Sequence, residues 1–294
     1  MKPELTQASE LLRRNTPETI EEAIGLLQNT VFSFSMKVCG HREDAEDTMQ
    51  EVLFRSLPHL AKVQDPKALA AWLYTVTRNR CRRMRRTHVQ PNSAALSLDE
   101  LMPDDAELGR LLLDARSGPE VNAISTEHDR FLHQAVLRIP PPLRMVLVLH
   151  DMEELSTEEV AQILDLQPGT VRVRLHRARL AVRKEMTRLL HGLPEPETKS
   201  KRTAPERPAD CRALFARLSE YIDNRVEPRT CDQMRSHIEG CPACVAFLND
   251  LKAAIDRCRT LKLSCDPAIA QRMREMMAKE YLRLIGSGDP VQKA

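Results

Sequence analysis

Three cysteines and one histidine have the spacing of metal ligands, Cys211-x25-His237-x3-Cys241-x2-Cys244. His237 and Cys241 lie four residues apart across an expected helix end. Pro242 begins the next helix, so that Cys244 returns to the same point. Thiolate and imidazole ligands at this spacing suit a closed tetrahedral zinc site. The sequence therefore predicts that these four residues bind Zn²⁺.

Cys231 is the alternative to Cys211 as the fourth ligand. It lies six residues before His237 in the same expected helix, which puts the two side chains on different sides of that helix. The chain has eight cysteines, and in a reducing compartment clustered cysteines indicate metal or redox chemistry rather than disulfides. The other cysteines are expected outside the site, as core or surface thiols: Cys39, Cys81, Cys258 and Cys265.

A basic helix is expected to begin at Pro168, whose fixed φ suits the first helical position. At about 100° per residue, four apolar residues share its buried side: Val171, Leu175, Ala178 and Val182. The roughly opposite side is suited to a DNA major groove and carries Arg172, Val173, His176 and Arg177. Arg174 and Arg179 flank this side and can reach backbone phosphates.

A shorter helix is expected directly before it. Ser156 and Glu159 form a capping box at its start, and the turn at 165–167 separates it from Pro168. Two helices joined by so tight a turn suggest a helix-turn-helix.

A second basic run, RNRCRRMRR, follows the helical pattern that Pro66 opens. So dense a run of cations repels itself unless an anionic partner lies against it. The arginines assigned to DNA binding in this run are Arg78, Arg80, Arg82 and Arg83, with Arg85 and Arg86 continuing it.

Acidic residues gather in the segment HREDAEDTMQEVLFRSL. One face of the expected helix is strongly negative and carries Asp47, Gln50 and Glu51. The apolar residues are expected on another side, which is buried: Ala45, Met49, Val52, Leu53 and Phe54.

The elements that position these residues are all expected to be helices. Nine glycines and 3% aromatic residues argue against an all-β design, and long Leu/Ala/Arg/Glu-rich segments indicate an all-α fold. Residues 1–17 are polar and are expected to be frayed. The expected modules are residues 18–88, a linker at 89–117, residues 118–190, a flexible tether at 191–209 and residues 210–285.

The whole-chain charge carries little information, because the formal net charge is only +2. The N-terminus MKPELTQASE lacks the apolar core of a signal peptide, and no stretch approaches the length of a membrane span. We therefore expect a cytoplasmic protein without a membrane partner.

The segments DAEDTMQEV, AWLYTVTRNR and PPPLRMVLVLHDMEELSTEEVAQILDLQPGTVRVRLHRAR together resemble the bacterial extracytoplasmic-function (ECF) sigma factors. The resemblance covers about residues 18–190. Its first block is similar to sigma region 2, its second to region 4, and a full region 3 is missing, as in that family. In the turn of the helix-turn-helix the family usually has Gly where this chain has Asp165; Asp tolerates the left-handed conformation, so the turn is expected to survive.

The resemblance implies roles for the charged surfaces. Asp47, Gln50 and Glu51 would dock on the clamp helices of the RNA polymerase β′ subunit, and region 4 would meet the β flap. The arginines of the second basic run would grip the minus-10 element, where a base is flipped from the duplex. The helix beginning at Pro168 would read the minus-35 element.

The C-terminal module, with its LSEYIDNRVEP stretch, resembles the zinc-binding anti-sigma domain over about residues 209–260. The first ligand of that family, when it is Cys, matches Cys211. In that family three helices wedge between regions 2 and 4 and a fourth wraps region 2. Residues 267–285 are expected to supply the fourth helix.

These patterns predict a sigma factor regulated in cis by an intramolecular contact with its own anti-sigma-like zinc domain, and not an enzyme. The alternative is a stand-alone helix-turn-helix regulator with a zinc-stabilised dimerisation or sensing domain. The acidic helix discriminates between the two, because it has no use in the alternative. A zinc hydrolase is disfavoured, because a four-ligand cysteine-rich site leaves no open position for water.

Overall fold

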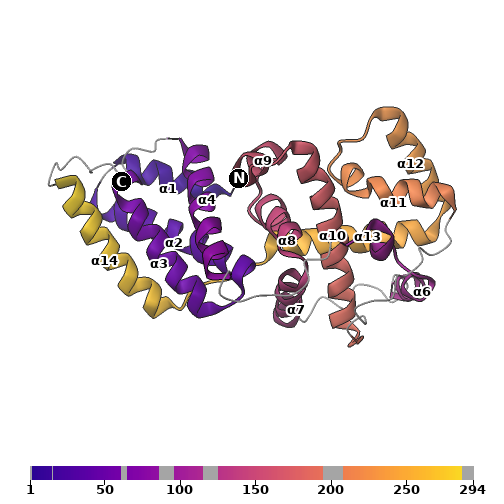
Figure 1. Ribbon diagram of the computed structural model, residues 1–294, viewed down its shortest axis with the longest axis horizontal. Helices are drawn as coiled ribbons and strands as arrows, with labels where there is room; N and C mark the ends of the chain where they lie inside the picture. The colour runs from indigo at the N-terminus through magenta and orange to yellow at the C-terminus, as the bar shows by residue number, and fades with distance from the viewer. Residues whose placement is uncertain are drawn as a thin grey trace. The chain divides into compact units, whose positions relative to one another are not determined.

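The computed structural model describes residues 2–14, 16–60, 65–85, 96–114, 125–194 and 208–286. Every regular element in these ranges is a helix, which confirms the all-α class (Figure 1). Two compact units divide the chain. One contains residues 1–91, 148–168 and 262–294, and the other contains residues 92–147 and 169–261.

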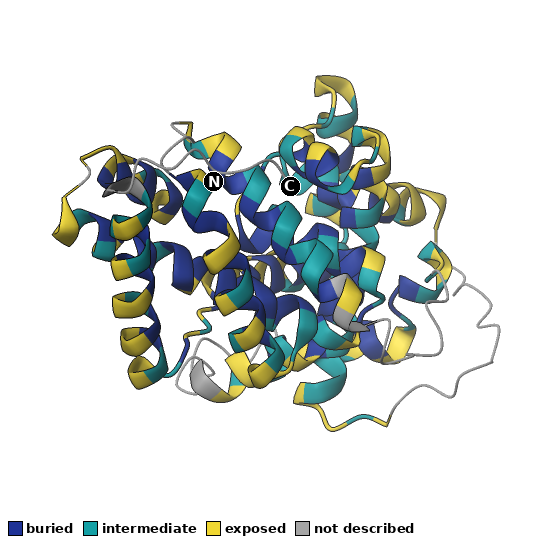
Figure 2. Ribbon diagram, turned by 60° about the vertical axis from the view of Figure 1, so that its left-hand side comes forward, coloured by how far each residue is buried: buried dark blue, intermediate teal, exposed yellow. Residues whose placement is uncertain are grey.

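The first unit is built on three amphipathic helices, α2 (Pro17–Cys39), α3 (Arg42–Leu60) and α4 (Pro66–Arg85). Thr16 caps α2 through a capping box, and Gly40 ends the helix at φ 87°, a conformation that suits glycine. The apolar stripe expected for α2 is fully buried and comprises Ile20, Ala23, Ile24, Leu27, Val31 and Phe34. Figure 2 shows buried and exposed residues alternating along the helices in the way this periodicity requires.

The N-terminal segment differs from its expected frayed state. Residues 3–14 form the helix α1 (Pro3–Arg14), which packs on α2 and α4. Its buried side is made by Leu5, Ala8, Leu11 and Leu12. These four residues recur at helical spacing, which is typical of an amphipathic helix. The expectation of a frayed segment was based on the polar composition and overlooked this spacing.

The last helix, α14 (Pro267–Gly286), packs on α2 and α3, as expected for the fourth helix of an anti-sigma domain (Figure 1). Gln28 Nε2 donates a hydrogen bond to the Ala270 carbonyl oxygen at 3.1 Å, across 242 residues of sequence. Gly25 lies where α14 approaches α2, and a Cβ atom there would sit 3.4 Å from the Arg274 side chain. A side chain at this position would make an ordinary van der Waals contact with Arg274.

The same unit holds the first part of the helix-turn-helix. A short π-helix, η2 (Val148–Met152), leads to Glu153 and then to α9 (Thr157–Leu164). Ser156 caps α9 with the expected capping box. Asp165 ends it at φ 55°, which confirms that Asp165 takes the left-handed conformation.

The second unit contains the linker helices α5 (Leu98–Leu101) and α6 (Asp105–Asp114), then α7 (Ser125–Arg138) and α8 (Pro141–Leu147). It continues with α10 (Pro168–Leu190), which lies in this unit from Gly169 onward. Three further helices complete it: α11 (Ala209–Ile222), α12 (Pro228–Gly240) and α13 (Pro242–Thr260).

Its core includes the buried stripe expected for α10, Val171, Leu175, Ala178 and Val182, of which the most exposed is Leu175 at 2%. The described part of the linker contains the helices α5 and α6. Residues 86–95 and 115–124 of the linker region and residues 195–207 of the tether lie outside the described residues. Among the helices that the structure describes, none is both long and apolar enough to cross a membrane.

Candidate metal centre and nucleic-acid interface

Three helices bring the predicted metal ligands together. Cys211 lies in the first turn of α11, and His237 lies in the last turn of α12. Cys241 ends α12 and begins α13, because Pro242 starts the new helix directly after it. Cys244 follows in the first turn of α13.

The ligand atoms of these four residues all lie within 4.8 Å of one another. His237 Nε2 is 3.3 Å from Cys211 Sγ and 3.4 Å from Cys244 Sγ, and the two sulfurs are 3.8 Å apart. A tetrahedron with Zn–S bonds of about 2.3 Å and Zn–N bonds of about 2.0–2.1 Å has S–S edges of about 3.8 Å and S–N edges of about 3.5 Å. The donor atoms therefore have the spacing that a tetrahedral zinc ion needs.

The electrostatics of the cluster also suit a cation. Burial raises the pKa of Cys244, and hydrogen bonding to Cys241 and the charge of Cys211 raise it further. Burial acts to raise the pKa of Cys241 as well, but hydrogen bonds from the backbone N–H groups of Cys244 and Ala243 and from the neighbouring thiols lower it overall. A divalent cation among these sulfurs would relieve the repulsion between thiolates.

The structure places Cys211, and not Cys231, in this cluster. Cys231 lies on α12, where its sulfur is 3.9 Å from the Arg235 guanidinium. An apolar pocket of about 240 Å³ adjoins the ligands and is lined by residues from α11 and α13 together with Met102, Pro103 and Leu108. Apolar surroundings of this kind limit the access of water to a metal site.

The basic helix α10 is partly covered by the zinc module. Arg172 and Val173 are exposed, Val173 by 53%, whereas Arg174, His176 and Arg177 are half-buried. Arg179 has no exposed surface at all. The residues assigned to DNA binding on this helix therefore divide into two exposed ones, Arg172 and Val173, and four that are half-buried or buried.

Arg179 is held by a bidentate ion pair. Its Nη1 and Nη2 atoms each lie 2.9 Å from a carboxylate oxygen of Asp223, the residue that ends α11. The Asp223 side chain is only 15% exposed. A buried, two-point contact between guanidinium and carboxylate is the strong form of this interaction. In this structure the predicted phosphate contact of Arg179 is occupied by a carboxylate.

His176 also faces the zinc module. Its Nδ1 lies 2.9 Å from the Ser219 hydroxyl, and its ring packs edge-on against Phe215 with centroids 6.2 Å apart. Burial, followed by the positive charges of Arg179 and Arg177, lowers the pKa of His176 to about 4. The imidazole is therefore neutral near pH 7 and packs as an uncharged ring.

Sequence reasoning did not identify Arg183, which anchors the far half of α10. Its guanidinium is 1% exposed, pairs with Glu107 of α6 and lies 2.6 Å from Asp250 of α13. It also stacks over the Phe247 ring, 4.4 Å from the centroid. No acidic residue lies between Arg172 and Lys184, so the partners of Arg183 could not come from the preceding turns of its own helix.

The basic helix α4 carries two of its arginines in intramolecular contacts. Arg78 donates a hydrogen bond to the Ile163 carbonyl of α9, and Arg80 Nε lies 2.7 Å from Glu51. Arg83 is exposed. The side chains of Arg82 and Arg85, and the whole of Arg86, lie outside the described residues.

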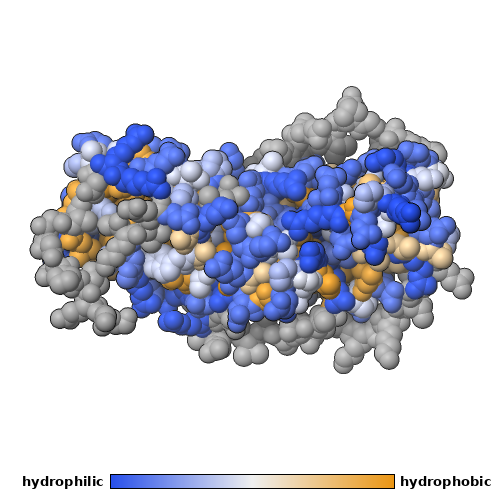
Figure 3. All heavy atoms as spheres, turned by 90° about the horizontal axis from the view of Figure 1, so that it is seen from above, coloured by the Kyte–Doolittle hydropathy of each residue, from blue (hydrophilic) through white to orange (hydrophobic). Residues whose placement is uncertain are grey.

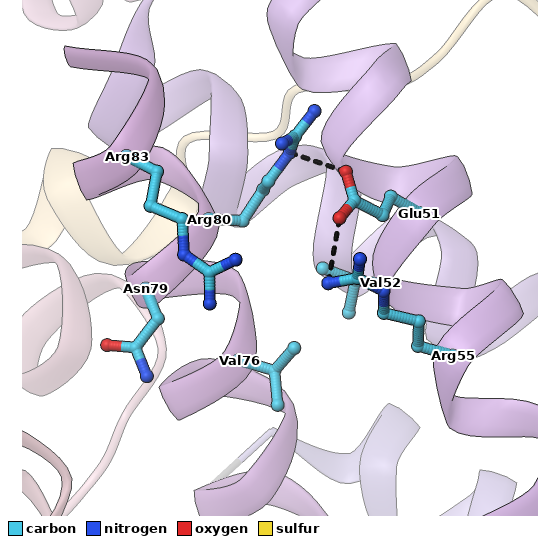
Figure 4. Close-up of a pocket in the computed structure, with 7 residues that line it drawn as sticks. All are labelled: Glu51, Val52, Arg55, Val76, Asn79, Arg80 and Arg83. Atoms are coloured by element: carbon cyan, nitrogen blue, oxygen red, sulfur yellow. Dashed lines mark ion pairs between the residues drawn. The ribbon is translucent and has the colours of Figure 1, made fainter. Parts of the chain in front are cut away.

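A pocket of about 120 Å³ lies between α3 and α4. Figure 4 shows Glu51 between the guanidinium groups of Arg55 and Arg80, at 2.9 and 2.7 Å, with Arg83 and Asn79 on the α4 side. Three arginines against one carboxylate leave this pocket positive, so it suits an anionic guest such as a phosphate. Within the described part of the arginine run, Glu51 pairs with Arg80.

The acidic face of α3 is accessible. Asp47 and Gln50 are exposed and Glu51 is half-buried, while α14 packs elsewhere on α3. Phe54 corrects an expectation, because it was placed on the buried side of α3 but is 52% exposed. It lies seven residues after Asp47, and this spacing puts the two on one side of the helix. The surface of the molecule seen in Figure 3 is mainly hydrophilic.

Three family models match the chain. The model for Sigma-70 region 2 matches residues 24–89, the model for Sigma-70 region 4 matches residues 132–182, and a zinc-finger model matches residues 211–244. The last match begins at Cys211 and ends at Cys244, the first and last members of the metal-ligand cluster.

Curated relatives agree with these models. The chain is 24% identical over 177 residues to the ECF RNA polymerase sigma factor SigW of Bacillus subtilis, covering 60% of this chain and 92% of that protein. It is 26% identical over 186 residues to the RNA polymerase sigma-H factor of Pseudomonas aeruginosa, covering 63% and 94%. It is 30% identical over 141 residues to the ECF RNA polymerase sigma-E factor of Escherichia coli K12, covering 47% and 72%. Because it matches both sigma regions in order and covers 72% of a relative to which it is 30% identical, this chain belongs to the ECF RNA polymerase sigma factors.

Proposed function

We propose that this chain binds core RNA polymerase, directs it to promoter DNA, and is held inactive by its own zinc module. The observation that carries the proposal is the bidentate ion pair between Arg179 of the recognition helix and Asp223 of the module. A promoter phosphate and the Asp223 carboxylate would compete for the Arg179 guanidinium. Arg179 therefore cannot bind DNA in the closed state, in which the zinc module covers α10.

The polymerase contact is assigned to α3. Asp47, Gln50 and Glu51 would meet the β′ clamp helices, with Phe54 as the apolar anchor at the centre of the contact. Region 4 would meet the β flap. The alternative of a stand-alone helix-turn-helix regulator leaves this exposed acidic and aromatic face without a partner.

Two helices are assigned to promoter DNA. The arginines of α4 and the positive pocket beside Glu51 suit the backbone of the minus-10 element, where phosphate contacts must offset the unstacking of a flipped base. On α10, the exposed residues Arg172 and Val173 could contact the minus-35 element directly. Arg177, His176 and Arg179 would contact it only after the zinc module is released.

The metal is assigned as a structural Zn²⁺ on Cys211, His237, Cys241 and Cys244. When bound, the ion would supply folding energy to the module, because its ligands come from three helices. Asp223 follows α11, so the metal sets the position of the residue that holds Arg179. Loss of the metal is therefore expected to release the recognition helix.

The tether between the sigma regions and the zinc module favours the closed state, in which the module covers α10. A covalently attached inhibitor acts at an effective concentration in the millimolar range, so modest contacts suffice to keep the chain closed. Activation then requires the contacts themselves to weaken, since the module cannot diffuse away.

The test is run-off transcription with core polymerase, comparing the full chain with a form ending at Leu190. The shorter form is expected to give more transcript. Equal or lower output would contradict inhibition in cis.

A second arm uses core-polymerase pull-down with the full chain. Asp47→Lys is expected to reduce binding, whereas reversal of another exposed carboxylate, Glu10→Lys on α1, serves as the matched control. Binding that is unaffected by Asp47→Lys would refute the assignment of α3.

A further inference from the structure

Glu153 is a fully buried carboxylate that neither the metal nor the proposed DNA contacts explain. It directly follows the π-helix η2, and its side chain is 0% exposed. Lys37 Nζ of α2 lies 2.8 Å from Oε1, and the Tyr74 hydroxyl of α4 donates to Oε2 at 2.8 Å. Lys2 Nζ, just before α1, lies 3.1 Å from Oε2.

These partners keep the buried group ionised. Burial acts to raise the pKa of Glu153, but the charges of Lys37 and Lys2 and the hydrogen bonds from Lys37 and Tyr74 lower it overall. Burial lowers the pKa of Lys37, an effect that the charge of Glu153 opposes. Burial, and then the charge of Glu153, raise the pKa of Tyr74 well above its usual value, so its hydroxyl stays protonated and donates.

The cluster joins two sigma regions. Lys37 and Tyr74 belong to region 2, whereas Glu153 belongs to region 4, 79 residues after Tyr74. Two further contacts lie beside it. Arg78 of α4 donates to the Ile163 carbonyl, and Lys67 Nζ is 4.0 Å from a Glu159 carboxylate oxygen. Residues 148–164 therefore dock on α2 and α4, and they do so without a residue of the zinc cluster.

The chemistry of this contact indicates an interface made to separate. An ion pair buried in a permanent core is often no more stable than well-packed apolar residues, because both charges lose their hydration. When two surfaces part, charged side chains regain that hydration, whereas apolar ones expose hydrophobic surface to water. The contact among Lys37, Tyr74 and Glu153 thus fixes one docked position. It keeps the free-energy cost of separating the two surfaces lower than an apolar contact would.

We propose that the surface formed by Lys2 and by Lys37 and Tyr74 of region 2 is a docking site for the acidic segment of the same chain's region 4, with Glu153 as the anchor. This contact, here called the Glu153 clasp, holds the two promoter-binding regions together independently of the zinc module. It also occupies Arg78 of α4, so the clasp must open before α4 can use that arginine on DNA. The effect of the clasp on DNA binding rests on the proposed sigma function, whereas the contacts of Glu153 do not depend on it.

The clasp can be measured directly in the full chain. Carbodiimide joins a lysine amine to a nearby carboxylate without a spacer, and Lys67 and Glu159 are 72% and 24% exposed at 4.0 Å. Mass spectrometry of the Lys67–Glu159 cross-link therefore reports closure. Glu153→Gln, which removes the charge but keeps the shape, is expected to lower the cross-link yield several-fold and to raise run-off transcription.

Two companion variants separate the clasp from general stability. Tyr74→Phe removes one hydrogen bond and is expected to give a smaller loss of cross-link with unchanged helix content by circular dichroism. The triple variant Lys37→Met, Tyr74→Phe, Glu153→Leu replaces the charges with apolar groups. It is expected to keep the cross-link and to transcribe less than wild type, because its surfaces resist separation.

An unchanged cross-link in both Glu153→Gln and Tyr74→Phe would overturn the clasp, as would a loss that occurs only together with global unfolding. The cross-link does not depend on polymerase. A chain that cross-links as expected but never directs transcription would instead refute the proposed function and leave the clasp standing.

Discussion

In the proposed inhibition in cis, the residue that holds α10 most directly is Asp223. Its carboxylate makes both contacts to the fully buried Arg179 guanidinium. Asp223→Asn removes the charge and leaves Arg179 without its bidentate partner, and breaking a buried pair in this way costs about 3–5 kcal/mol. We expect the full-length variant to give more run-off transcript than wild type, by tenfold or more where closure limits the output.

The matched control for Asp223→Asn is Asp232→Asn in the same module. Asp232 is 74% exposed and pairs with Arg235, one turn away on α12. An exposed pair of this kind contributes little, so this control should transcribe like wild type. Equal behaviour of the two variants would remove Asp223 from its assigned role.

The lowered pKa of His176 predicts how the free energy of unfolding depends on pH. Burial, with Arg179 and Arg177, lowers its pKa from 6.5 to about 4, so the folded state binds this proton less readily than the unfolded state. The contribution of His176 to stability is therefore fully present above pH 6.5 and is lost as the pH falls from 6.5 toward 4. We expect the free energy of unfolding, measured by urea titration, to decrease across this window.

The metal ligands also take up protons in acid, so the pH prediction needs a variant that isolates His176. His176→Gln keeps a polar group opposite Ser219 and cannot titrate. Its unfolding free energy should fall less steeply between pH 6.5 and 4 than that of wild type. Parallel pH profiles for the two proteins would show that His176 does not contribute.

At the scale of single elements, helix boundaries followed from local chemistry. Ser156 and Glu159 set the start of α9, Pro168 set the start of α10 and Gly40 ended α2, because caps and fixed dihedrals act within a few residues. The metal cluster was predictable for the same reason, since three of its four ligands lie within eight residues of sequence.

Orientation around a helix was less predictable. Phe54 is adjacent to the buried Leu53, and composition alone cannot say on which side of the apolar boundary an aromatic ring falls. Glu154 adopts a left-handed φ of 57°, although nothing in its side chain favours that conformation. Both features depend on what packs against the element, and the local sequence does not contain that information.

The zinc site yields a prediction about the three helices it joins. Cys211 alone brings α11 to the cluster, while Cys231 lies outside it. Cys211→Ser is therefore expected to weaken zinc binding by orders of magnitude and to lower the helix content of the purified protein. Cys231→Ser should keep one zinc per chain, as measured by atomic emission.

Cys231→Ser is the matched control for Cys211→Ser, because it also replaces a thiol by a hydroxyl, on the helix that carries His237. Loss of zinc from the Cys231→Ser chain together with retention by the Cys211→Ser chain would reverse the ligand assignment. Chelator treatment of wild type should reproduce the circular dichroism of the Cys211→Ser protein.

Across the whole molecule, the contacts that join sequence modules were the least predictable. Arg179 with Asp223, Arg183 with Asp250 and Lys37 with Glu153 link residues that lie 44, 67 and 116 positions apart. Each residue alone has the sequence context of an ordinary charged surface position. Only the folded chain shows that these charges are buried and matched, which is why Arg179 was assigned to DNA and Arg183 received no role.

The molecule has two separate sets of closing contacts, and this separation predicts how they combine. The Arg179–Asp223 pair lies in one compact unit and the Glu153 clasp lies in the other, with no shared residue. Substitutions at sites without shared partners usually have additive free energies, so their effects on an equilibrium constant multiply. The full-length chain carrying both Asp223→Asn and Glu153→Gln should therefore show the product of the two single-variant increases in promoter binding, measured with core polymerase at fixed salt. A double variant no more active than the better single one would mean that one closing contact controls the other, and that the chain opens in a single concerted step.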